Sequence, residues 1–60
     1  MSAADRAALA LQDVTAAGAS LRLAINYAAE HPVTADVLIG DAEKELRRAL
    51  RILAEQGSKA

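Results

Sequence analysis

The sequence predicts an all-α fold: an antiparallel two-helix hairpin that self-associates into a four-helix bundle or a larger helical assembly. Three observations lead to this prediction. Apolar residues recur at helical spacing, and no stretch alternates apolar and polar residues as a strand does. A strong break at Pro32 divides the chain. With 60 residues, no cysteine and one aromatic residue, the chain has little material for a core of its own, so we expect self-association.

The first helix is expected to run from about residue 3 to residue 29. Its apolar positions step by three and four without a polar exception, a pattern typical of a seam packed on a partner. This predicted oligomer seam contains Ala4, Ala7, Leu11, Val14, Gly18, Leu21, Ile25 and Ala28. Beside it runs a ridge of alanines at spacing seven, which allows close approach of another helix backbone: Ala3, Ala10, Ala17 and Ala24.

Gly18 leaves two interpretations open. A glycine inside a helix costs about 1 kcal/mol relative to alanine, so its presence needs a reason. The favoured interpretation is a continuous helix with a tight helix crossing at Gly18. The alternative is a kink, or a break into two shorter helices, within residues 16–20.

A second apolar stripe lies on roughly the opposite side of the first helix. It consists of Leu9, Ala16, Leu23 and Tyr27. One hairpin cannot cover both stripes, and a second stripe on a helix usually marks another subunit or partner. We therefore predict Leu9, Leu23 and Tyr27 as a partner-binding face, with Arg47, Arg48 and Arg51 as its polar rim. Scattered surface leucines are the alternative.

The second helix is expected over about residues 35–56, after a turn at residues 30–34. Thr34 is a suitable N-cap, and Gly57 a suitable residue to follow the helix end, so residues 57–60 should fray. Asp41, after Gly40, is an alternative start. The apolar stripe again steps by four and three, and completes the oligomer seam with Ala35, Ile39, Ala42, Leu46, Ala49 and Leu53.

A basic stripe on the second helix is the candidate phosphate-binding site: Lys44, Arg47, Arg48 and Arg51. Arginine forks suit phosphate, and repetition by symmetry would extend the stripe for a nucleotide or RNA. Acidic neighbours and a net charge of −1 argue against this use. We expect pairs of Glu43 with Arg47 and of Glu45 with Arg48, as on an ordinary solvated helix face.

No catalytic, cofactor-binding or metal-binding set is found. His31 is the only histidine and lies at a helix end, where a protonated ring interacts favourably with the helix dipole. Glu30, His31 and Asp36 follow no ligand-spacing motif. We therefore expect a protein that is not an enzyme and has no cofactor.

No membrane segment or export signal is expected. The longest uncharged run, Val14 to Leu21, is too short to span a bilayer, and the first residues lack the pattern of a secretory signal. A cytoplasmic protein is the resulting expectation.

The segment from Ala42 to Leu50 has the alanine–leucine spacing of second helices in small hairpin proteins. The whole layout resembles the two-helix hairpins of bacteria and bacteriophages. That resemblance implies a four-helix-bundle regulator of RNA, an inhibitor of a host protein, or a ring that sequesters cyclic nucleotides. We expect a homodimer or higher oligomer that inhibits or regulates a partner protein. The alternative is a hairpin that binds phosphate, a nucleotide or RNA.

Overall fold

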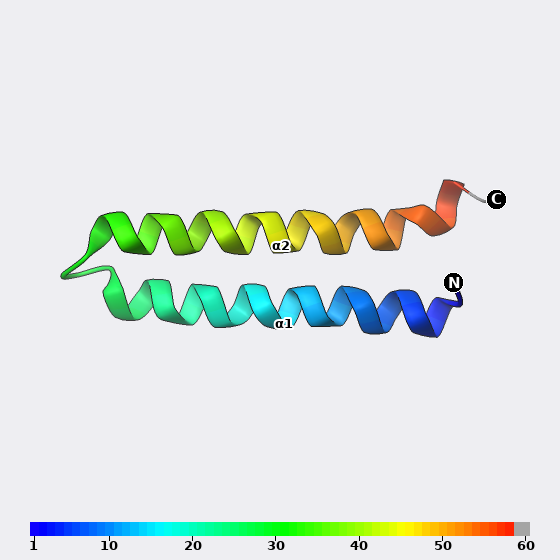
Figure 1. Ribbon diagram of the computed structural model, residues 1–60, viewed down its shortest axis with the longest axis horizontal. Coiled ribbons are helices and arrows are strands. Elements are labelled where there is room, and N and C mark those ends of the chain that lie inside the picture. The colour runs from blue at the N-terminus through cyan, green and yellow to red at the C-terminus, as the bar shows by residue number, and fades with distance from the viewer. Residues whose placement is uncertain (59–60) are drawn as a thin grey trace.

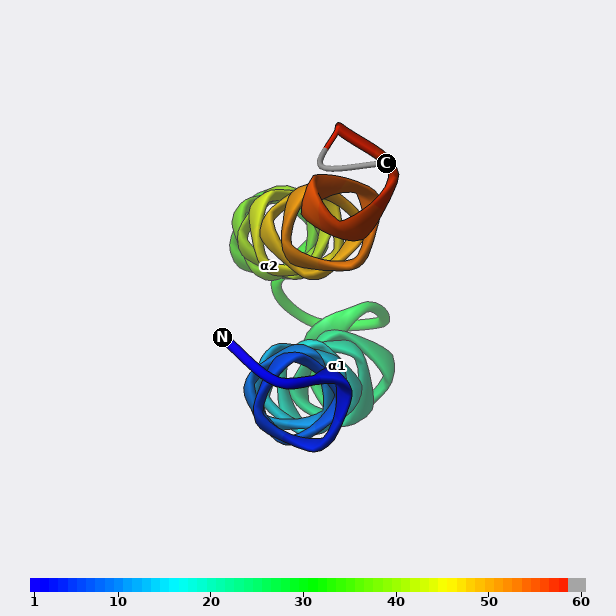
Figure 2. The ribbon, with the colours of Figure 1, turned by 90° about the vertical axis from the view of Figure 1, so that its right-hand side faces the viewer.

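The computed structural model describes residues 1–58, which form two helices joined by a short turn: α1 (Ala3–Tyr27) and α2 (Pro32–Ser58). The helices lie side by side and antiparallel, with the start of α1 and the end of α2 opposite the turn (Figure 1). The Cα atoms span 48 × 16 × 9 Å, so the molecule is two helices wide and one helix thick (Figure 2). The all-helical, hairpin-like fold predicted from the sequence is confirmed.

Helix α1 is continuous through Gly18. Ser2 caps its first turn, because the Ser2 hydroxyl oxygen accepts a hydrogen bond from the Asp5 backbone N–H at 3.0 Å. No atom of α2 lies within 4 Å of the position that a Cβ on Gly18 would occupy. The favoured interpretation of a continuous helix is confirmed and the alternative of two shorter helices is wrong, whereas the tight crossing predicted at Gly18 is absent within one chain.

The turn is shorter than predicted. Helix α1 ends at Tyr27 instead of residue 29, and α2 begins at Pro32, before both Thr34 and Asp41. The His31 N–H donates to the Tyr27 carbonyl at 2.7 Å, and the His31 carbonyl accepts from the Ala35 N–H at 3.0 Å. Proline suits the first helical position, because a residue there needs no N–H donor.

Helix α2 continues through Gly40 and Gly57 to Ser58, so its predicted end at residue 56 is two residues early. The remainder of the predicted frayed tail, residues 59–60, lies outside the described residues.

The contact between the helices is made of alanine. The buried apolar residues in the described chain are Ala10, Ala17 and Ala24 of α1 and Ala35, Ala42 and Ala49 of α2. Counted from the turn, each alanine of α1 lies level with one of α2, as the antiparallel arrangement requires. Because methyl groups are small, the two backbones approach closely. The predicted alanine ridge of α1 is thus the surface that packs on α2. Of the leucines, only Leu38 is half-buried beside this contact, and the others are exposed.

Candidate interaction surfaces

One broad side of the hairpin, here called the apolar face, carries large apolar side chains from both helices. On α1, Leu11 and Ile25 each follow a buried alanine by one position, and Val14 and Leu21 each follow one by four positions. Because a helix turns by about 100° per residue, both offsets place the side chain on the same side of the buried alanines. The exposed fractions of its side chains range from 39% at Leu46 to 76% at Ile25. The apolar face comprises Leu11, Val14, Leu21 and Ile25 of α1 and Ile39, Leu46, Leu50 and Leu53 of α2.

All of the large residues predicted for the oligomer seam are therefore brought together on one face of a single copy. Gly18 is half-buried and lies in the same row of α1 as Leu11 and Ile25. The seam residues Ala35, Ala42 and Ala49 are instead buried against α1.

The opposite side, here called the bridged face, carries polar contacts between the helices. Arg48 donates from Nε and Nη2 to Oδ1 of Asp13, at 3.0 and 2.8 Å. The Asp13 side chain is only 10% exposed, whereas that of Arg48 is 59% exposed. Farther along, the Ser20 hydroxyl donates to Oε1 of Glu45 at 3.4 Å. Among the described residues, the one nearly buried carboxylate is therefore that of Asp13, and it forms an ion pair with the guanidinium of Arg48.

The Asp13 carboxylate raises the pKa of the Arg48 guanidinium above its ordinary value, through the hydrogen bond first and the opposite charge second. Glu45 adds to the increase, and partial desolvation opposes it. Because the pKa is raised on folding, the stabilisation from Arg48 is fully present below the ordinary arginine pKa. It is lost only in strongly alkaline solution, so the contact persists through the neutral range.

We expect Arg48→Gln to lower the midpoint of thermal unfolding, because it leaves the nearly buried Asp13 carboxylate without its charged partner. The matched control is Arg47→Gln. Arg47 pairs at 2.6 Å with Glu43 on the same exposed helix surface, and such pairs contribute only about 0.3–0.5 kcal/mol. Thermal unfolding followed by circular dichroism should show a drop several times larger for Arg48→Gln. Equal drops for the two variants would contradict this role of Asp13.

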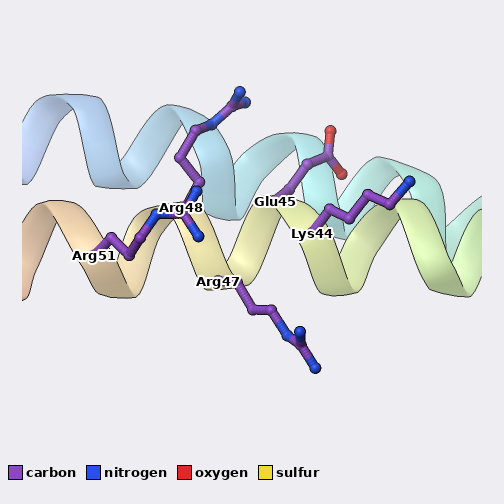
Figure 3. A pocket seen from close by; sticks show the side chains of 5 residues that line it. All are labelled: Lys44, Glu45, Arg47, Arg48 and Arg51. Atoms are coloured by element: carbon purple, nitrogen blue, oxygen red, sulfur yellow. The ribbon is translucent and has the colours of Figure 1, made fainter.

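The predicted phosphate-binding stripe lines a surface hollow of about 400 Å³, formed by Lys44, Glu45, Arg47, Arg48 and Arg51. Arg48 extends toward α1, whereas Arg47 points away from α1 (Figure 3). Both guanidiniums are engaged by carboxylates, Arg48 by Asp13 and Arg47 by Glu43. The predicted pair of Glu43 and Arg47 is present, but Arg48 bonds to Asp13 and Glu45 bonds to Ser20.

The predicted partner-binding residues Leu9, Leu23 and Tyr27 lie along α1 toward the bridged face, with exposed fractions of 39%, 45% and 41%. Of the predicted polar rim, Arg48 reaches this side and Arg47 does not (Figure 3).

The tip of the hairpin holds the single histidine. The ring of Tyr27 meets the His31 ring edge-on, with the two centroids 6.0 Å apart. Within residues 1–58 no three histidine, aspartate or glutamate side chains are grouped so that they would hold a metal ion.

Asp13 and Ser20 are the functional candidates that the sequence analysis does not identify, and Glu45 bonds to Ser20 instead of its predicted partner Arg48. The available signal was spacing: Asp13 and Ser20 each lie three residues after a core alanine and four before the next. They therefore continue the row that faces α2, and a charged residue in such a row calls for a partner on the facing helix.

Comparison of the chain with family models, curated proteins and solved structures finds no match. In the described part of the chain, neither helix combines the length and the apolar character that crossing a membrane requires.

Proposed function

We propose that this chain is a non-enzymatic interaction protein, whose hairpins associate with one another and bind and inhibit or regulate a partner protein. The observation that carries the proposal is the placement of apolar side chains on opposite sides of a molecule one helix thick. The buried apolar residues of its own core are all alanines, and of the leucines, isoleucines and valines only Leu38 and Ile52 are half-buried, while the others are exposed. Large contiguous apolar surfaces on small proteins usually serve association.

The two sides suit different contacts. The apolar face draws large apolar side chains from both helices, with Glu43 seven residues before Leu50 in the same row of α2, and its apolar area suits a large and permanent interface. The bridged face combines Leu9, Leu23 and Tyr27 with the polar contacts of Asp13 and Arg48. Tyrosine and arginine are enriched where proteins bind one another, which favours this side for the regulated partner.

Leu23→Asp is expected to abolish partner binding while leaving helicity and subunit number unchanged. Leu21→Asp is the matched variant, because Leu21 lies two residues earlier on the apolar face with a similar exposed fraction, 40% against 45%. It is expected to disrupt self-association. The partner is captured from a bacterial lysate on immobilised protein and identified by mass spectrometry, and subunit number is measured by light scattering. A captured polypeptide retained equally by wild type and Leu23→Asp would refute the assignment of the bridged face.

Binding of phosphate, a nucleotide or RNA by the basic stripe has less support. The stripe surrounds one hollow, which favours an anion. However, Asp13 and Glu43 already neutralise two of its guanidiniums, and Glu45 lines the same hollow. An incoming phosphate would have to compete with these carboxylates.

A further inference from the structure

We propose that a second copy of this chain docks on the apolar face with its turn at the opposite end. In this arrangement α1 packs antiparallel on α1 of the second copy, about a twofold axis beside Val14. The inference rests on the self-association proposed above. It specifies which face of the hairpin forms the interface, how the second copy is oriented, and which residues of the two copies lie opposite each other.

The exposed area of the hairpin matches what a dimer needs. A compact monomer of 6.2 kDa exposes about 3,700 Å². This chain exposes 4513 Å², an excess of about 800 Å². A stable protein–protein interface of standard size buries about 800 Å² on each partner. One face of the hairpin, with Cα extents of 48 × 16 Å, is large enough to supply that area.

The apolar row of α1 is complementary in side-chain size to the same row of a second copy that runs in the opposite direction. Small residues fill much of its first half, and its second half carries two of the largest side chains. An antiparallel copy centred near Val14 brings Gly18 opposite Leu11 and Ala4 opposite Ile25. It also brings Ala7 opposite Leu21, so a large side chain meets a small residue at these three levels, and Val14 meets its own copy on the axis. The space beyond Gly18 is open in a single copy, as this packing requires.

The centre of this packing coincides with the centre of the molecule. Thr15 is the middle residue of α1, and Glu45 is the middle residue of α2. Counted from the turn, Glu45 lies level with Val14, so an axis beside Val14 overlaps the two hairpins along their full length. With both turns at the same end instead, α1 would stack on α2 of the other copy. Leu11, Val14 and Leu21 would then meet large residues, and Gly18 would have no large partner.

The charges on the outer side of α2 favour the same orientation. Glu43 and Arg47 stand two residues before and two residues after Glu45. Reversal about the central axis therefore places Glu43 of each copy near the level of Arg47 of the other. In the orientation with both turns together, α2 of one copy runs beside α1 of the other, where uncharged Ala16 is level with Glu43.

Disulfide cross-linking tests the orientation, because the natural chain has no cysteine. Val14→Cys should convert most of the protein to a covalent dimer under mild oxidation, since cysteines on the axis come within the roughly 7 Å Cα separation that a disulfide spans. Ile25→Cys is the control. Its two copies would lie about 33 Å apart at 1.5 Å per residue and should not cross-link. The readout is the mass on a non-reducing gel, 6.2 kDa or twice that value.

A second pair of variants tests the packing at Gly18. Gly18→Leu should fill the space reserved for Leu11 of the other copy and weaken dimerisation at least tenfold. Gly40→Leu is the control, because its Cβ also meets no atom within 4 Å and it lies outside the apolar face. It should leave dimerisation unchanged. Both replacements improve helix propensity, so loss of the helix itself does not explain a difference.

The outcomes separate this inference from the proposed function. A dimer by light scattering that cross-links through Val14→Cys supports both. A dimer that fails to cross-link there, but does so in the double variant Val14→Cys with Leu46→Cys, overturns the orientation and leaves self-association intact. Covalent linkage of Ile25→Cys, or equal dimerisation of Gly18→Leu and Gly40→Leu, likewise overturns the inference. A chain that stays at 6.2 kDa at micromolar concentration overturns both proposals.

Discussion

Replacing Ala17 by leucine is expected to force the two helices apart and lower the free energy of unfolding by about 1–3 kcal/mol. Ala17 is 1% exposed, and Ala42, which lies level with it on α2, is also 1% exposed. A leucine therefore finds no free volume between the helices. Small domains have stabilities of about 0.05–0.15 kcal/mol per residue, so this loss is a large fraction of the total. Urea unfolding followed by circular dichroism measures it.

Ala8→Leu is the matched control for Ala17→Leu. Ala8 is exposed on the outer side of α1, where a larger side chain meets solvent. Its effect should stay within about 0.5 kcal/mol, as for ordinary surface substitutions. If both leucine variants unfold at the wild-type midpoint, the alanine contact does not hold the hairpin together.

The second large effect is expected from Ile39→Asp on the apolar face. Docking a second copy there would bury the new carboxylate without a partner, at a cost of about 3 kcal/mol or more. The dimer should then dissociate at least a hundredfold more readily. Light scattering should give 6.2 kDa. Helicity should also fall at micromolar concentration if, as proposed, association stabilises the folded hairpin.

Val37→Asp serves as the control for Ile39→Asp. Val37 is also β-branched, lies two residues earlier on α2 and is 60% exposed, against 49% for Ile39. The helix turns by about 200° between the two positions, so Val37 lies off the apolar face. Its aspartate variant should keep the mass and helicity of the wild type. Dissociation of both variants to the same extent would show that charge on α2, and not the apolar face, controls assembly.

Much of the fold follows from local chemistry. Alanine and leucine form helices, and Pro32 cannot continue α1, so two helices and one turn are expected from the sequence. The boundaries were less accurate, because Pro32 and Thr34 are both good helix starts and the choice depends on the bonds of His31. The candidate surfaces were also recognisable as stripes at helical spacing. Asp13 was not, since its significance depends on Arg48, which lies 35 residues away.

Periodicity alone identified the stripes of α1, but it could not choose which one turns toward α2. The alanine row and the leucine row lie one residue apart, about 100° around the same helix, and both satisfy a heptad. Only packing decides between them. In the folded hairpin the alanines let the backbones meet closely and place Asp13 within reach of Arg48. The leucines are then left outside, and that rotation of the helices creates the apolar face.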